Sequence, residues 1–291
     1  MKFEFKCQGD DFEQIPKEVI EKAGVSFPNV HTNSHCMAVL AKEIKNHTNN
    51  KICIIPFCTT VEAEALGGII KLGDEKVGPR VGKYVFNDIK DLNNLQKISF
   101  KSKRIKEVLD CIGELDSVGE IVALNVEGPF TIISSLIDPM IFYRGLRKNK
   151  NVAEGFLKVI EDSIVEYIEE GIKRGAKIIS YGDPVGSIDI VGPKVYEEVS
   201  GKITYNILKR TEKSMINSII HLCGKTSTAF ERIGLCKSVP IEFDEELTYG
   251  EAICRVIDTR KDVKIIGHAC IKKSRVLIKK PIVWSINLCK L

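Results

Sequence analysis

The chain has 291 residues, of which 43 are Lys or Arg and 39 are Asp or Glu, so its formal net charge is +4. Its 44% hydrophobic and 28% charged residues are ordinary for a folded protein, and they exclude disorder, a collagen-like fibre and a membrane bundle. Such a weak net charge does not favour nucleic acid as a partner. The unusual feature is the number of cysteines, which is 10.

These cysteines do not predict a disulfide framework, because no short spacing repeats and a chain of this length can bury a full core without cross-links. The N-terminal segment MKFEFKCQGDDFEQ has no apolar core of a signal peptide. No stretch approaches the roughly 18 apolar residues that span a membrane. We therefore expect a cytoplasmic protein with free thiols and no membrane association, in which several thiols are small core residues.

Taken in chain order, the first 50 residues predict a helical extension, with a helix at 31–47 that Asn33 or Ser34 can cap. Short apolar runs then alternate with amphipathic segments. Strands are predicted at 51–58, 120–129, 176–184, 215–224, 237–245, 262–270 and 281–289. Helices are predicted at 59–73, 101–117, 133–149, 153–175, 192–211, 226–234 and 248–258. This alternation is typical of a parallel sheet with helical crossovers. Because no Pro- or Ser-rich linker interrupts it, we expect one domain over residues 1–291.

Two parallel architectures fit this pattern, an open doubly wound sheet and a (β/α)8 barrel. No strand is followed by the G-x-G-x-x-G fingerprint of a dinucleotide site, and CGKTS lacks the first glycine of a phosphate loop. Polar side chains instead follow several strands, namely Glu127, Asp183, His221, Cys223, Asp244, His268 and Cys270. A barrel gathers such strand ends around one mouth, so the sequence favours a (β/α)8 TIM barrel.

The sharpest local motif is His221-Leu222-Cys223, which ends the apolar run SIIHLCG. Residues i and i+2 of a strand point to the same face, so His221 and Cys223 converge while Leu222 points away. An imidazole and a thiolate are suited to Zn²⁺, although the same pair can be a buried core histidine beside a core cysteine.

A zinc site needs a third donor, and two cysteines are candidates. Cys270 ends the strand-like segment IIGHAC, while Cys289 ends WSINLC near the chain end. We favour Cys270, because a ligand close to a terminus is harder to hold rigid. His268 would then share a face with Cys270 and could bind the metal or hydrogen-bond to a ligand.

Zinc held by one nitrogen and two sulfurs keeps a fourth position open, which is a catalytic arrangement. Such a site is suited to holding a substrate thiol as thiolate that can attack a methyl group. Two carboxylates, Asp183 in YGDPVGS and Glu127 in NVEGPFT, are candidates for positioning the substrate, although each could be a helix cap or a solvated loop residue.

One family resembles this chain over about residues 28–270, in five segments that occur in order: FPNVHTNSHCMAVLAKEI, PFCTTVEAEALGG, NVEGPFTIISSLID, YGDPVGSIDIVGPKVYEE and HLCGKTSTAFERIG. It is the uroporphyrinogen decarboxylase superfamily, and within it the methylcobamide:coenzyme M methyltransferase branch is the most similar. The resemblance implies a (β/α)8 barrel with a zinc-binding His-x-Cys motif, matched here by His221 and Cys223, and a later cysteine.

The activity implied by the resemblance is transfer of a methyl group from a methylated corrinoid (cobalamin) protein to a zinc-bound thiol such as coenzyme M, with cobalt leaving as Co(I). The corrinoid protein would be a separate partner docked over the barrel mouth. In the family the later cysteine lies on the final strand, which favours Cys289, whereas the local pattern favours Cys270. The chain is also shorter than is usual in the family, and no closing helix follows the last predicted strand.

Two other functions are compatible with the sequence. A tetrapyrrole decarboxylase would share the fold, but it needs an N-terminal Arg-rich segment, and the first 50 residues contain no Arg. It would act without metal. A non-catalytic corrinoid- or metal-binding partner would bind the corrinoid protein without turnover.

Overall fold

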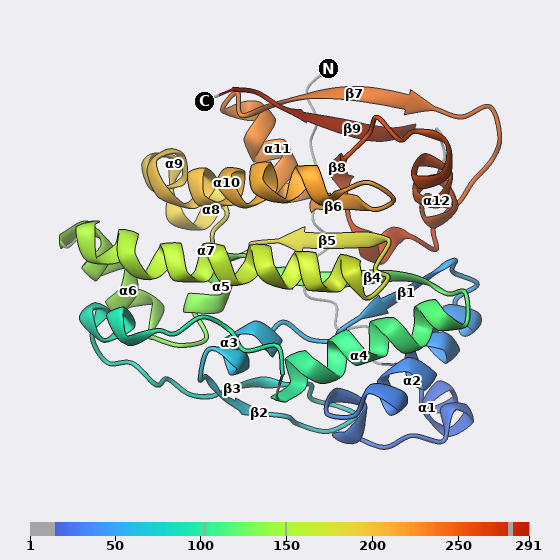
Figure 1. Cartoon of the computed structure of the whole chain (residues 1–291), viewed down its shortest axis with the longest axis horizontal. Coiled ribbons are helices and arrows are strands. Elements are labelled where there is room, and N and C mark those ends of the chain that lie inside the picture. The colour runs from blue at the N-terminus through green and yellow to red at the C-terminus, as the bar shows by residue number, and fades with distance from the viewer. Residues whose placement is uncertain (1–14, 102, 149, 279–281, 291) are drawn as a thin grey trace.

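The computed structural model describes residues 15–101, 103–148, 150–278 and 282–290. Within them, seven strands form one sheet in the order β1-β4-β5-β6-β8-β9-β7, and β2 and β3 form a separate antiparallel pair (Figure 1). The strands are β1 Ile52–Ile55, β2 Ile69–Lys71, β3 Arg80–Lys83, β4 Ile121–Glu127, β5 Ile178–Gly182, β6 Ile219–Cys223, β7 Cys236–Glu242, β8 Ile265–Ala269 and β9 Ile282–Leu288.

The helices occupy the connections between these strands. They are α1 Lys17–Ala23, α2 Ser34–His47, α3 Val61–Ala65, α4 Lys103–Ser117, α5 Pro129–Ile133, α6 Pro139–Lys148, α7 Lys150–Lys173, α8 Ile188–Val191, α9 Pro193–Val195, α10 Gly201–Thr211, α11 Gly224–Arg232 and α12 Tyr249–Thr259.

Strands β1, β4, β5, β6 and β8 run parallel to one another and carry the predicted α/β character of the chain. They are short and almost wholly buried, as the apolar runs predict for strands covered on both faces. The parallel sheet with helical crossovers is therefore confirmed.

The end of the sheet differs from an ideal eight-stranded barrel. Strand β9 is antiparallel to both of its neighbours, β8 and β7. In the part of the chain that the structure describes, no ladder joins β1 to β7. The sheet ends at β7 instead of closing on β1.

The two faces of the sheet are covered differently. Figure 1 shows α4, α7 and α10 lying across one face. The apolar side chains on that face, such as Leu124, Ile179 and Leu222, belong to the largest buried cluster. The opposite face packs against α12, where Ile178 and Ile219 meet Ile253. Alternate residues of each strand therefore point into different cores.

Several predicted elements are present with small shifts. The helix at 31–47 forms α2, and the Asn33 side chain accepts the N–H of Cys36 at 2.9 Å as the predicted cap. The helix predicted at 59–73 is wrong beyond α3, because Gly67 adopts a φ of +99° and the chain then enters β2.

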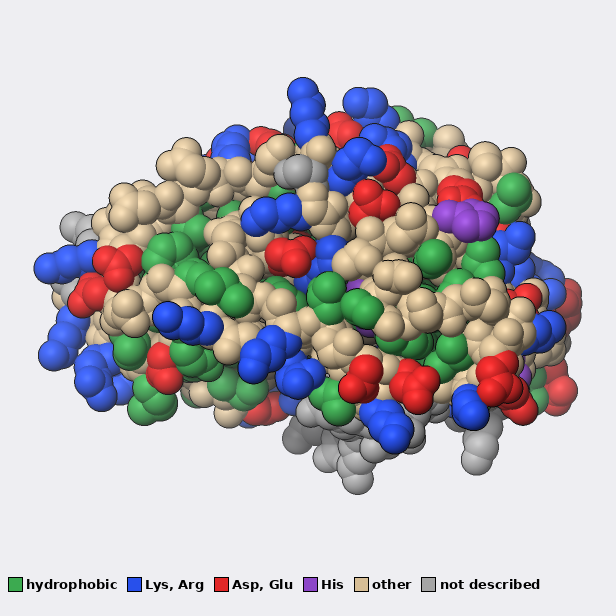
Figure 2. Space-filling view, turned by 90° about the horizontal axis from the view of Figure 1, so that it is seen from below, with side chains coloured by type: hydrophobic (Ala, Val, Ile, Leu, Met, Phe, Trp, Pro, Cys, Tyr) green, Lys and Arg blue, Asp and Glu red, His purple; other side chains and the backbone are tan. Residues whose placement is uncertain are grey.

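Some predicted segments include positions outside the described residues, namely 1–14 of the N-terminal extension, Ser102, Asn149 and Pro281. Among the described helices, none combines the length and apolar character needed to cross a membrane. On the face drawn in Figure 2, basic and acidic side chains are interspersed, as expected for a net charge of +4.

Candidate functional site

The candidate site lies at the carboxyl ends of three adjacent strands, β4, β5 and β6. Asn125, Ser180 and His221 are paired across these strands and form one lateral row. The next row begins with Glu127, which is paired with Gly182. The same register extended by two residues places Cys223 beyond Gly182 on β6. Because paired residues of parallel strands point to the same face, Glu127 and Cys223 share a face with His221.

His221 is almost completely buried, with 1% of its surface exposed. Burial lowers the pKa of its imidazole to about 4, so the ring is neutral at physiological pH. Its Nε2 is buried without a hydrogen-bond partner within the described structure. A neutral imidazole with an unsatisfied nitrogen is the form that binds a metal ion.

Cys223 follows His221 on the same face, as the alternation of the strand predicts. It is partly exposed and is the N-cap residue of α11. The pair predicted from the sequence is therefore brought together at one strand end.

The two candidate third donors lie in different surroundings. Burial first, and then the charge of Cys270, raise the pKa of Tyr249, and the Tyr249 ring packs edge-on against His221 with 5.7 Å between the ring centroids. The backbone of Cys289 instead makes hydrogen bonds to two other residues. Its N–H donates to the Leu235 carbonyl, and its carbonyl accepts from the Tyr205 hydroxyl at 2.6 Å. Cys270 is thus near enough to Tyr249 for its charge to act on that hydroxyl, and the Tyr249 ring in turn contacts His221.

The donors nevertheless form an incomplete set. Across the described residues, no three His, Cys, Asp or Glu side chains are grouped closely enough to hold a metal ion. His221 and Cys223 provide two donors of suitable chemistry.

His268 has a different role from the one expected. Its φ is +59°, which breaks the alternation of β8 and turns the ring toward α11 and β7. Its Nδ1 lies 3.2 Å from Thr228 Oγ1, and its Nε2 lies 2.6 Å from Ser238 Oγ and 3.0 Å from Glu231 Oε2. Both ring nitrogens have partners, so His268 connects elements of the fold instead of facing the site.

Asp183 is a structural residue in this arrangement. Its carboxylate is 4% exposed and accepts hydrogen bonds from Phe130 N, Thr131 N, Thr131 Oγ1 and Gly186 N at 2.7 to 3.3 Å. Burial raises the pKa of Asp183, and these hydrogen bonds act against the rise. Asp183 therefore fixes the start of α5 and with it the turn that follows Glu127.

The carboxyl group of Glu127, unlike that of Asp183, accepts no hydrogen bond from a donor in the described structure. Burial first, and then the charges of Glu62 and Asp183, raise its pKa well above the usual value, while Lys272 lowers it. Glu62 is 1% exposed, and its Oε1 accepts the backbone N–H of Glu127 at 3.0 Å. Burial raises the pKa of Glu62 to about 7. Two carboxyl groups with elevated proton affinity therefore lie together at the end of β4.

Sequence reasoning did not identify three of the residues around the site. Glu62 lies within the helix predicted at 59–73, and no local pattern marks it as buried. The hydroxyl groups of Tyr196 and Tyr249 are buried without a partner in the described structure. Burial first, and then the charges of Asp183, Cys236 and Cys223, raise the pKa of Tyr196. No local motif distinguishes such tyrosines, because their positions depend on tertiary contacts.

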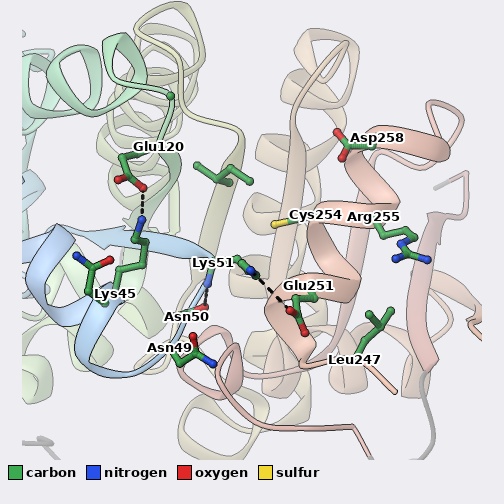
Figure 3. Close-up of a pocket in the computed structure, with 13 residues that line it drawn as sticks. Lys45, Asn49, Asn50, Lys51, Glu120, Leu247, Glu251, Cys254, Arg255 and Asp258 are labelled. Atoms are coloured by element: carbon green, nitrogen blue, oxygen red, sulfur yellow. Dashed lines mark hydrogen bonds and ion pairs between the residues drawn. The ribbon is translucent and has the colours of Figure 1, made fainter. Parts of the chain in front are cut away.

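A cavity of about 590 Å³ lies elsewhere, at the amino ends of β1 and β4 and beside α12 (Figure 3). Its charged side chains include the pairs Lys45–Glu120 and Lys51–Glu251. Parallel sheets place their chemistry at the carboxyl ends of the strands, so we do not assign the site to this cavity.

The fold and the paired donors at the carboxyl ends of parallel strands define an α/β protein of the barrel type with a candidate catalytic mouth. Residues 13–269 match the family model described as uroporphyrinogen decarboxylase (URO-D). This match covers most of the chain, and the chain belongs to that family.

Individual relatives are more distant. The chain is 25% identical over 258 residues to "Methylcobamide:CoM methyltransferase MtaA" of Methanosarcina barkeri, covering 86% of this chain and 74% of the relative. It is 26% identical over 218 residues to "Methylcobamide:CoM methyltransferase MtbA" of Methanosarcina acetivorans, covering 72% and 62%. A solved "methyltransferase from Methanosarcina mazei" aligns with a TM-score of 0.63 and 26% identity, over 71% of this chain and 60% of that one. The chain thus spans about three fifths to three quarters of these proteins, and the solved fold supports the barrel type.

Proposed function

We propose that this chain is a methyltransferase that moves a methyl group from a methylated corrinoid, carried by a partner protein, to a small thiol such as coenzyme M. The observation that carries the proposal is the unsatisfied, neutral Nε2 of His221 beside Cys223 at the carboxyl ends of the parallel strands. The names of the relatives, which are methylcobamide:CoM methyltransferases, support the same reaction.

In this proposal His221, Cys223 and Cys270 hold a zinc ion. Zinc would lower the pKa of a bound thiol and hold it as a thiolate. Cys270 is preferred to Cys289 because its charge contributes to the raised pKa of Tyr249, so it lies near that residue, and the Tyr249 ring contacts His221. The described donors are not grouped as a set of three, so His221 and Cys223 are the pair that would hold the metal and Cys270 is the third donor that the metal analysis below tests.

The residues of this chain have separate tasks. The buried His221 stays neutral and presents Nε2 as a donor. Asp183 acts through the β4–α5 turn, which it holds by four hydrogen bonds, and so positions Glu127. His221 is 1% exposed and packs against the Tyr249 ring, so water is excluded from its side of the site.

The proposal is tested by metal analysis and by methyl transfer from methylcobalamin to a thiol. We expect about one zinc per chain in the wild type and in Cys36→Ser, a control thiol on α2. We expect zinc to be lost in Cys223→Ser and Cys270→Ser. Active wild-type protein without zinc would refute the metal assignment, and loss of zinc in Cys289→Ser but not in Cys270→Ser would reverse the choice of ligand.

The same assays separate the alternatives. Release of CO2 from a tetrapyrrole by metal-free protein would identify a decarboxylase. Binding of a corrinoid protein with no methyl transfer would identify a non-catalytic partner.

A further inference from the structure

The cavity of about 590 Å³ at the amino ends of β1 and β4 has no task in the proposed reaction. It lies between two walls (Figure 3). Residues of the segment 45–51, which precedes β1, form one wall together with Glu120, and one face of α12 forms the other. The apolar side chains of Ile121 and Leu247 also line the cavity. A space of this volume suits a small molecule.

The wall formed by α12 is a regular row of polar side chains. Glu251, Cys254 and Asp258 all line the cavity and are spaced by three and four residues, so they lie above one another on one face of the helix. The capping box between Thr248 and Glu251 fixes the start of this helix. The row therefore has a carboxylate at each end, and the helical rise places these two positions about 10 Å apart.

Most charged groups of the cavity already have close partners. Lys45 donates to Glu120 at 2.5 Å, and the Arg255 guanidinium binds both carboxylate oxygens of Glu245 at 3.0 and 3.2 Å. Glu251 uses its Oε2 to cap α12, where it accepts two hydrogen bonds at 2.9 Å. These groups are committed to the protein itself.

Two opposite charges remain, one on each wall. Lys51 has one ion pair with a described residue, a long contact of 3.9 Å between its Nζ and Glu251 Oε1, and its side chain is 55% exposed. The carboxylate of Asp258 is exposed and makes no hydrogen bond or ion pair with a described residue. The backbone of Lys51 is held in place, because its N–H donates to Asn50 Oδ1 at 2.8 Å and Asn50 Nδ2 donates to Ser274 Oγ at 2.7 Å.

The separation of these two charges sets the length of a ligand that reaches both. Lys51 lies beside Glu251, so its ammonium group is on the order of 10 Å from the Asp258 carboxylate. A charged hydrogen bond at each end takes up about 2.8 Å. The charges of the ligand would therefore be about 4–5 Å apart, which suits an ammonium and a carboxylate joined by a few methylene groups.

We propose that this cavity binds a small ω-amino acid, with its carboxylate on Lys51, its ammonium group on Asp258 and its methylene groups against Ile121 and Leu247. The cavity lies at the opposite ends of the strands from the His221–Cys223 pair. Binding of this ligand is therefore a property separate from the proposed methyl transfer, and each can fail without the other.

The first test uses the wild-type chain and γ-aminobutyrate as the probe. Titration of methyl-labelled protein followed by NMR should shift the methyl signals of Ile121 and Leu247 and leave that of Ile190, exposed on α8, unchanged. Butyrate and propylamine each carry one of the two charges, so we expect each to bind about fivefold more weakly. Unshifted Ile121 and Leu247 signals would refute the site, and equal affinities for γ-aminobutyrate and butyrate would refute recognition of both charges.

The second test exchanges the charge at each end of the cavity. Asp258→Lys makes both ends cationic, so we expect it to bind γ-aminobutyrate at least about fivefold more weakly and to bind glutarate, a dicarboxylate, more tightly than the wild type does. Lys51→Glu makes both ends anionic, so we expect the same loss together with a gain for putrescine, a diamine.

The control variants are Glu75→Lys and Lys76→Glu, at exposed positions between β2 and β3 that do not line the cavity. They should keep the wild-type affinities for all probes, and methyl transfer should be the same in all five proteins. If Asp258→Lys or Lys51→Glu kept the wild-type preference for γ-aminobutyrate, the assignment of its two ends would be wrong. Absence of methyl transfer from every protein, with binding intact, would instead refute only the proposed function.

Discussion

The role of Asp183 as a structural anchor makes a quantitative prediction. Asp183→Ala removes one buried carboxylate and leaves four donors on Phe130, Thr131 and Gly186 without an acceptor. The site cannot relax freely, because Gly128 and Gly186 lie so close that an added methyl group on either would clash with the Asp183 side chain.

Each hydrogen bond contributes about 1 kcal/mol net, and breaking a buried charged network costs about 3–5 kcal/mol. We therefore expect Asp183→Ala to lower the free energy of unfolding by about 3–5 kcal/mol. Asp183→Asn keeps one acceptor oxygen but turns an amide toward a backbone donor, so we expect a smaller loss of about 1–3 kcal/mol.

The assay is urea unfolding followed by circular dichroism on the wild type and both Asp183 variants. The control is Asp74→Ala, which removes two hydrogen bonds to an exposed turn and should leave the midpoint unchanged. A loss below 1 kcal/mol in Asp183→Ala, with an unchanged denaturant slope, would show that the four contacts do not hold the β4–α5 turn.

Three further predictions follow from other contacts. The pKa of Glu62 is raised on folding from 4.5 to about 7, so the wild type should lose about 3 kcal/mol of stability as pH rises through this range; Glu62→Gln should abolish that dependence in urea melts at pH 4.5 and 7. Thr248→Ala removes the capping box with Glu251 at the start of α12 and should lower the unfolding free energy by about 1 kcal/mol, whereas Thr248→Ser should preserve it. Gly267→Ala places a methyl group 2.7 Å from Ser227 Cβ and should cost about 1–3 kcal/mol in the same assay; an unchanged melting temperature would contradict the close packing of β8 on α11.

The sequence predicts well those features that depend on local patterns. Helix α2 and its Asn33 cap follow from periodicity and one polar residue, and His221 and Cys223 share a face because strand side chains alternate. The (β/α) character follows from the alternation of apolar runs with amphipathic segments.

Features that depend on distant contacts could not be predicted in this way. The antiparallel pairing of β9 with β7 and β8 is set by packing at the end of the sheet. The sequence of β9 is an apolar run like those of the parallel strands, so it does not predict the direction of the strand. The ring of His268 turns away from the site because its φ is positive. The presence of a histidine in a sequence does not predict a positive φ. The buried Glu62 accepts a hydrogen bond from a residue 65 positions later in the chain, a contact that no local pattern indicates.

The antiparallel end of the sheet has a consequence for synthesis of the protein. Strand β7 ends at Glu242 and its partner β9 begins at Ile282, about 40 residues later. At about 5–20 residues per second, a ribosome needs roughly 2–8 s to make the intervening segment. Within the described residues β9 is the strand that pairs with β7, so during this interval the N–H and C=O groups of β7 can pair with other nascent chains. Slow translation over this stretch should therefore lower the yield of folded protein by aggregation before β9 emerges.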